Sequence, residues 1–461
     1  MFSANVIDTF GLNGCDDFKF VQVTFAPRMN DLLLKAIRIL MGRGVVAVFS
    51  LLFTVYFAYE LPKVIFGLIA LHTMSVSFSK VFTDLGLYYC VLRNAPPLLQ
   101  DGQDKKAVDE FIAPGTLIRS SLAVVLTSVY VGSGYLYVDD LQANFQELDI
   151  AFILPFAGFH LLVQNLLYIL SPLFLSLERF GTDSFFDSFG VFLEQVAAVI
   201  CYLLFGINFY FVGILIGKGL NLLIIMLLLR KTLVLFSIKP SIFAKGIALL
   251  REYIAFYVRQ FFRLGMKQFD QLMIAVILPI EQLANYELAR KGSNWLKHVI
   301  KAFGLPLTVK FSKSTDPAER RKYGRTYFLY TLPIPILLAC LSPWIMELMG
   351  GEKYADSWYI LCILYTSFAL YTISNFQFSV IAMYAKNTES LWQDVIAGIV
   401  GVGSALILIL IFREYGMAWG QLLTYLTLSI AGYRITKKYL DKEPENPPVE
   451  PEVIARDVKQ V

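Results

Sequence analysis

Long apolar blocks alternate with short polar segments over most of the chain. Each block has about 20 or more residues, enough for a helix to cross a hydrocarbon layer of roughly 30 Å. The blocks, and the Gly, Pro and charged residues between them, predict twelve helical spans. These are expected at 33–57, 65–91, 117–138, 149–175, 185–206, 209–231, 249–277, 284–309, 326–349, 356–384, 390–412 and 416–439. The first, seventh and eighth carry charges, so counts of ten and fourteen helices stay open.

Composition indicates the same fold class. Of the 461 residues, 57% are hydrophobic and 16% are charged, and the mean hydropathy is +0.60. A soluble chain of this length needs a more polar surface. We therefore expect an all-α polytopic membrane protein of about twelve transmembrane helices, arranged as two pseudo-symmetric six-helix bundles around a central cavity.

The distribution of Cys and His limits the chemistry. Five cysteines and three histidines are dispersed along the chain, which argues against a disulfide framework and against a metal site. Neither a nucleophile–base arrangement nor a Walker motif is visible, and no basic tail suggests nucleic acid. The sequence therefore predicts neither an enzyme nor a cofactor, and no nucleic-acid partner.

Lys and Arg are unevenly divided between the two sets of loops. One set holds Arg93, Lys105, Lys106, Arg179, Arg230, Lys231, Lys239, Lys245, Lys310, Lys313, Arg320, Arg321, Lys322, Arg325 and Lys386. The opposite set holds only Lys63, Lys353 and Arg413. The positive-inside rule places the first set in the cytoplasm. Both termini are then cytoplasmic, and the expected location is the inner (plasma) membrane.

The chain divides near its middle. NYELA at 285–289 resembles FGLIA at 66–70, and both segments follow a proline and an outward loop with an acid. Two six-helix halves would explain this echo, as in many secondary transporters. The expected parts are a cytoplasmic N-terminal extension (1–32), a first bundle (33–231), a cytoplasmic linker (232–248), a second bundle (249–440) and a disordered, Pro- and Glu-rich cytoplasmic tail (441–461).

Cations form a stripe on each of two neighbouring spans. In the seventh, REYIAFYVRQFFRLGMKQFDQ (251–271), Arg259, Arg263 and Lys267 fall within an arc of about 80° that Asp270 shares. In the eighth, the stripe lies within about 60° and has Glu287 at its margin. It consists of Arg290, Asn294, Lys297 and Lys301.

The energetic cost of these charges indicates where they face. A charge at the bilayer centre costs about 2.5–3.5 kcal/mol, so six such cations exceed the typical 5–15 kcal/mol stability of a domain. Nearby acids are too few to neutralise them, and snorkelling rescues only those near the helix ends. A hydrated, cationic cavity is the remaining explanation. We add Arg43 to its candidate substrate-binding residues, and take Asp84, Asp270, Glu287 and Lys218 as coupling or ion-pair candidates.

A cationic cavity selects anions by electrostatic focusing, and arginine forks match phosphate oxygens. The expected substrate is thus an anion, with phosphate or diphosphate as the natural choice. If that anion is a lipid headgroup, its tail stays in the membrane while the cavity holds the polar part. Such an arrangement describes a lipid flippase.

Four stretches resemble motifs of one transporter family. They are FTDLGLYYCVLR (82–93), DQLMIAVILPIEQLANYELA (270–289), MGGEKYADSW (349–358) and REYGMAWGQLLTYL (413–426). Their order and spacing resemble the polysaccharide transporter (O-antigen flippase) family of the multidrug/oligosaccharidyl-lipid/polysaccharide (MOP) superfamily. The resemblance implies alternating access that moves an undecaprenyl-diphosphate-linked oligosaccharide outward, with membrane lipids and polysaccharide polymerase or ligase components as partners. Asp84 and Asp270 match motif positions, and the match leaves their role open.

Three other functions stay open. A multidrug or cation antiporter of the same superfamily would favour an acidic or aromatic cavity. A lipid II flippase is chemically closer, but that resemblance implies fourteen helices. A membrane enzyme of polysaccharide assembly would need larger extramembrane loops than this chain has.

The loop charges make topology testable. A cysteine introduced into 139–149 (DDLQANFQELD) is expected to react with a membrane-impermeant thiol reagent applied outside intact cells. One introduced into 313–325 should react only after the cells are permeabilised. The opposite labelling would invert the topology.

Overall fold

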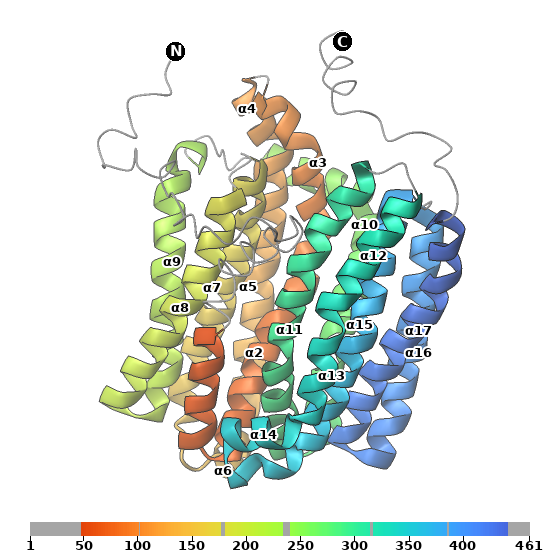
Figure 1. The fold of residues 1–461 in the computed structure, drawn as a ribbon. Coiled ribbons are helices and arrows are strands. Elements are labelled where there is room, and N and C mark those ends of the chain that lie inside the picture. Colours follow the sequence, from red (N-terminus) through yellow and green to blue (C-terminus); the bar gives the residue numbers. More distant parts are fainter. Residues whose placement is uncertain are drawn as a thin grey trace, which may run out of the picture.

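The computed structural model describes residues 48–100, 102–176, 180–233, 240–313, 317–384 and 387–440, and these are almost entirely helical, with no strand among them. A first helix, Val48–Glu60, precedes the labelled elements (Figure 1). The helices that follow are α2 (Lys63–Asp84), α3 (Leu87–Gln100), α4 (Asp104–Ala107), α5 (Ala113–Leu136), α6 (Val138–Asn144), α7 (Ile150–Ser176), α8 (Phe180–Phe205), α9 (Tyr210–Leu233), α10 (Pro240–Ile277), α11 (Ile280–Lys313), α12 (Pro317–Thr331), α13 (Pro333–Cys340), α14 (Ser342–Gly350), α15 (Trp358–Tyr384), α16 (Asn387–Phe412) and α17 (Glu414–Leu440).

The predicted fold class is confirmed, since the long helices follow the order of the predicted spans. In the part of the chain that the structure describes, seven helices are long and apolar enough to cross a membrane, and the bent helix α12–α14 raises this number to eight. Helices α10 and α11 differ from these in sequence, because both carry the charges already noted in the seventh and eighth spans. These two helices therefore need the protein itself, and not lipid, as their main environment.

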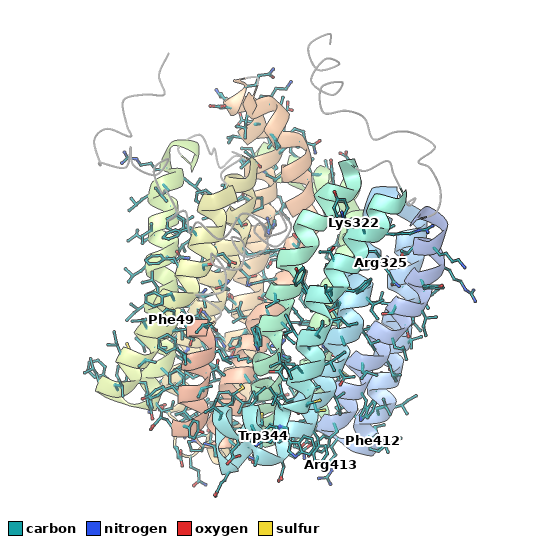
Figure 2. All side chains as sticks on the ribbon, viewed as in Figure 1. Phe49, Lys322, Arg325, Trp344, Phe412 and Arg413 are labelled. Atoms are coloured by element: carbon teal, nitrogen blue, oxygen red, sulfur yellow. The ribbon has the colours of Figure 1, made fainter. Side chains whose placement is uncertain are left out.

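The predicted single span at 326–349 is wrong in one respect, because the chain bends there by 69° between α13 and α14. Pro333 and Pro335 begin α13, and Pro343 begins α14. Proline lacks a backbone N–H and clashes with the preceding turn, so helices restart at it more easily than they continue through it. The bend places α14 across one end of the bundle (Figure 1). There the exposed Trp344 (Figure 2) is suited to a membrane–water interface.

The predicted span at 65–91 is also divided. Helix α2 ends at Asp84, and Leu85 and Gly86 both adopt left-handed backbone conformations, with φ of 50° and 72°. Gly86 lies directly against α10. A Cβ atom added there would be 2.9 Å from both the Tyr253 carbonyl oxygen and the Tyr257 nitrogen. The break thus redirects the chain into α3 at the point where α10 approaches most closely.

The two ends of the bundle differ in the way the loop charges predicted. Helix α4, with Lys105 and Lys106, lies at one end, and α6 and α14 lie at the other (Figure 1). Lys322 and Arg325 lie toward the α4 end, whereas Arg413 lies at the α14 end (Figure 2). The predicted outward loop at 139–149 contains a short helix, α6, which the sequence analysis did not anticipate.

The two halves of the chain meet along α2, α10 and α11. Helix α2 packs against both α10 and α11, and α10 also contacts α5 from the first half and α16 from the second. The fit is tight where α11 begins. A Cβ atom at Gly67 would be 2.4 Å from the Ile280 carbonyl oxygen. Helix α10 begins at Pro240, within the expected linker. The N-terminal extension, Arg43 and the tail lie outside the described residues.

We expect replacement of Gly86 by alanine to destabilise the protein by about 2–4 kcal/mol, because a left-handed alanine is strained and its Cβ overlaps the α10 backbone. The measurement is the apparent Tm of the purified protein in detergent. Gly102 provides a matched control, since it has the same φ of 72° but no atom within 4 Å of an added Cβ. Gly102→Ala should cost only about 1 kcal/mol. Equal losses in the two variants would contradict the packing argument.

Candidate functional site

Helix α10 carries the first predicted cationic stripe. Arg259, Arg263, Lys267 and Asp270 all belong to this helix, but the placement of their side chains lies outside what the structure describes. What is described is the position of the helix. It lies between elements of both halves, in contact with α2, α3 and α5 on one side and with α16 and α17 on the other. The stripe therefore belongs to a helix at the junction of the halves.

Helix α11 carries the second stripe, and part of it is neutralised locally. Glu287 is fully buried. Arg290 Nε donates to Glu287 Oε2 at 2.9 Å, and Lys291 Nζ lies 3.9 Å from Glu287 Oε1. These partners are one helical turn from the acid, so the pairs form within α11 itself. The structure thus shows Glu287 in an ion-pair role, and Arg290 as its main partner.

Of the remaining polar residues of the stripe, Lys297 contacts α15. Lys297 Nζ lies 5.4 Å from the ring centroid of Phe368 on α15. Asn294 is half-buried, and its Oδ1 atom is buried without a hydrogen-bond partner among the described residues. A buried amide oxygen without a donor is costly, which makes Asn294 a position where a ligand or water would be stabilised. The side chain of Lys301 lies outside the described part.

Asp84, which opens the DLGL stretch, is buried in the first half beside Arg119 of α5. Arg119 Nη2 lies 3.9 Å from Asp84 Oδ1. The same guanidinium donates through Nε to the Thr83 carbonyl oxygen at 3.1 Å and stacks 5.2 Å from the ring centroid of Tyr168. The sequence analysis did not single out Arg119, although a lone arginine in an apolar span is itself a signal. Its position explains Asp84 as the counter-ion of a buried cation at the end of α2.

Lys218 belongs to a second buried cluster in the first half. Its Nζ atom lies 3.0 Å from Glu194 Oε2, and His160 Nε2 lies 3.6 Å from Glu194 Oε1. His160 Nδ1 is 2.9 Å from His72 Nε2, and His72 Nδ1 is 3.1 Å from the Tyr130 hydroxyl. These five residues come from five helices. Sequence reasoning treated the histidines as dispersed, because no local spacing reveals contacts between residues 88 positions apart.

The MGGEKY stretch and the end of the first helix form hydrogen bonds with each other at the α14 end, and these bonds join the two halves of the chain. Gly351 has a φ of 61°, which turns the chain after α14. Lys353 Nζ donates to the Leu61 carbonyl oxygen, just after the first helix, where a cation complements the helix dipole. In the opposite direction, the Tyr59 hydroxyl donates to the Glu347 carbonyl oxygen at 3.1 Å. We call Tyr59, Leu61, Glu347 and Lys353 the α14 clasp.

Residues beside the clasp also explain two of the few cations at the α14 end. Lys63 and Lys353 both lie over the ring of Tyr354, at 5.0 and 5.4 Å from its centroid. Cations stack favourably on aromatic faces. Tyr354 itself is buried and packs edge-on against Phe66 of α2. These two lysines are therefore structural.

Among the described residues, Asp84, Glu194 and Glu287 each lie beside a cation. The α10 stripe belongs to a junction helix that contacts both halves. No group of three or more His, Cys, Asp or Glu side chains suited to a metal occurs in the described part of the chain.

Comparison with solved structures identifies the fold. No protein-family profile matches the sequence, and no curated protein matches it. The eukaryotic MATE transporter AtDTX14 aligns with a TM-score of 0.59 over 90% of this chain and 97% of its own, at 14% identity. An inward-facing multidrug resistance MATE family transporter of the MOP superfamily gives 0.60 over 88% and 98%, also at 14% identity.

The lipid II flippase MurJ, in its inward closed conformation, aligns with a TM-score of 0.56 over 91% of this chain and 93% of its own, at 14% identity. The chain therefore shares the fold of two kinds of membrane transporter. The resemblance to the polysaccharide transporter family in particular stays a prediction.

A structural role of Asp84 as the counter-ion of Arg119 can be distinguished from a role in substrate binding. We expect Asp84→Asn to cost about 3–5 kcal/mol, because it leaves the buried Arg119 guanidinium without its counter-ion. The double variant Asp84→Asn/Arg119→Met should recover much of this loss, since it removes both charges. The measurement is the thermal stability and monodispersity of each purified variant. A stable Asp84→Asn protein that fails to transport would instead assign the carboxylate to substrate or ion coupling.

Proposed function

We propose that the protein is a flippase that moves an undecaprenyl-diphosphate-linked oligosaccharide across the inner membrane by alternating access, for surface polysaccharide biosynthesis. The cationic faces of α10 and α11 hold the anionic headgroup, and the lipid tail stays in the membrane. Polysaccharide polymerase or ligase components are the proposed partners. Both termini are proposed to be cytoplasmic.

One observation carries this proposal: the two helices that carry the cations pack against α2 where the halves of the chain meet. In an alternating-access carrier, this junction is where a substrate is exposed first to one side and then to the other. A cationic stripe there attracts an anion. The shared fold with MurJ, a lipid II flippase, supports a lipid-linked cargo of this chemical class.

The proposed headgroup site consists of residues from the stripes. Arg259, Arg263 and Lys267 of α10 are its core, because arginine forks match the oxygens of a diphosphate. On α11, Asn294, Lys297 and Lys301 extend the site. Arg290 contributes less, because its guanidinium is engaged by Glu287. Arg43 completes the candidate set, and Asp270 is proposed to limit the positive charge of the α10 stripe.

A multidrug antiporter is the second candidate, supported by the fold shared with MATE transporters. Organic cations are the usual cargo that such a function requires, and the stripes would repel them. A lipid II flippase differs from the favoured proposal only in the glycan, which the described contacts do not discriminate. A membrane enzyme is the least supported, since the fold is shared with transporters.

We expect Arg259→Ala/Arg263→Ala to reduce transport more than tenfold while leaving the amount of protein in the membrane unchanged. Loss of two charge-assisted contacts of roughly 1.5–3 kcal/mol each accounts for this magnitude. The measurement is flipping of a fluorescent polyprenyl-diphosphate oligosaccharide in proteoliposomes, with transport of an organic cation and of lipid II measured in parallel.

The matched control is Lys322→Ala/Arg325→Ala, which removes two charges at exposed positions of α12 (Figure 2). This variant should flip the lipid at the parent rate. Normal flipping by the α10 variant would reject the headgroup site. Transport of the organic cation alone would favour the antiporter.

A further inference from the structure

The buried cluster around His72 and His160 forms a continuous chain across the first half of the molecule. It runs from Tyr130 on α5 through His72 on α2 and His160 on α7 to Glu194 on α8, and ends at Lys218 on α9. The two imidazoles are 3% and 4% exposed, and Lys218 is 5% exposed. Two adjacent imidazoles sealed from water need a specific arrangement of protons, because each contact can hold only one.

The Glu194 carboxylate at the end of the chain favours one of the two possible arrangements. A neutral imidazole has one N–H donor and one bare nitrogen acceptor. We assign the Tyr130 hydroxyl as the donor to His72 Nδ1, 3.1 Å away, because this direction turns an N–H of His160 toward Glu194; His72 then carries its proton on Nε2. His72 Nε2 then donates to His160 Nδ1 over 2.9 Å, which leaves the proton of His160 on Nε2. All the donors therefore point the same way, toward Glu194.

The chain is interrupted at its last contact. His160 Nε2 and Glu194 Oε1 are 3.6 Å apart, beyond ordinary hydrogen-bond range, and His160 Nε2 is a buried polar atom with no hydrogen bond to any described residue. Glu194 is instead held by Lys218 through its other oxygen, at 3.0 Å. The Glu194 carboxylate thus forms an ion pair with the Lys218 ammonium, but it is too far from the His160 imidazole for a hydrogen bond.

Charged groups on three helices surround the two imidazoles. Lys80 of α2 and Lys218 of α9 both act on His160, and Asp187 and Glu194 of α8 both act on Lys80. Glu194 is the carboxylate that lies beside the imidazoles, whereas Asp187 is exposed, and Tyr210 of α9 lies within the field of Glu194. One added proton leaves a net positive charge in a low-dielectric site, which is favourable only if the new cation pairs closely with a carboxylate.

We propose that His72, His160 and Glu194 form a proton-binding site inside the first half, separate from the cationic faces of α10 and α11. Uptake of one proton makes the shared pair of imidazoles a cation, with the charge on His160. His160 then closes the gap to Glu194, and Lys218 loosens its hold on the same carboxylate. Because His160, Glu194 and Lys218 belong to α7, α8 and α9, proton binding shifts how these helices pack. The proposal does not depend on the identity of the cargo.

The chain contains only three histidines, so imidazole NMR tests the site directly. The probe is full-length protein, labelled with ¹⁵N-histidine and reconstituted in lipid nanodiscs, and titrated between about pH 5 and about pH 9, where imidazoles change charge. His298→Gln removes the third signal, and His72→Gln assigns the other two. We expect both imidazoles as Nε2–H tautomers at high pH, and one shared protonation step on acidification.

Two outcomes would overturn the proposal. One is that both histidines stay neutral throughout the titration. The other is that each titrates independently, so that His160→Gln leaves the protonation of His72 unchanged. Mixed or opposite tautomers at high pH would equally reject the assigned direction of the chain.

Variants of the two flanking charges give opposite expected results. Lys218→Met frees Glu194 for the imidazoles and removes a repelling cation, so the pair should take up its proton at a pH about one unit higher. Glu194→Gln removes the attracting carboxylate, so protonation should need a pH about one unit lower. Each prediction stands if the other variant fails to fold. Glu147→Gln, at an exposed position, is the matched control and should leave the titration unchanged; an equal shift in this control, or none in either variant, would refute a local proton site.

Discussion

The structure depends on one constraint, which is that a charge surrounded by apolar helices needs a partner or water. Each half meets this constraint internally. Asp84 lies beside Arg119, Glu194 binds Lys218, and Glu287 binds Arg290. Because breaking such a pair is far more costly than replacing it, the two pairs that join different helices, Asp84–Arg119 and Glu194–Lys218, fix which helix faces meet. The α10 stripe belongs to a helix that contacts both halves, which is the position that the proposed headgroup site requires.

Backbone geometry determines how closely the halves approach. The left-handed residues Leu85 and Gly86 end α2 and turn the chain into α3 beside α10. Near the opposite end of the same helix, Gly67 admits the first turn of α11. Helix α2 is thus shaped at both ends to contact the second half, whereas its middle carries His72 toward the interior of the first. One helix therefore links the junction of the halves to the buried imidazoles.

The sequence predicted the fold well because hydropathy and loop charge are local signals. Apolar blocks located the spans, and the charged faces marked α10 and α11 as unlike the lipid-facing helices. It failed where the decisive contact joins distant residues. Arg119 lies 36 positions from the carbonyl of Thr83, and His72 lies 88 positions from His160, so neither contact has a period that can be read along the chain. The prolines at the bend after α13 are visible in the sequence, but the angle of the bend depends on packing at the end of the bundle.

The α14 clasp gives the molecule two unequal ends. The Lys353 ammonium donates to the Leu61 carbonyl oxygen and the Tyr59 hydroxyl donates to the Glu347 carbonyl oxygen, so segments almost 300 residues apart are bonded at one end of the bundle. In the proposed cycle, any rotation of the two halves that preserves those bonds pivots at the α14 end, and the displacement of the helices increases with distance from it. The α4 end of the bundle would then move furthest, while the packing at the α14 end changes least. In the proposed alternating-access cycle, opening the α14 end requires breaking the clasp, so a few backbone carbonyls and one ammonium would set the barrier to that step.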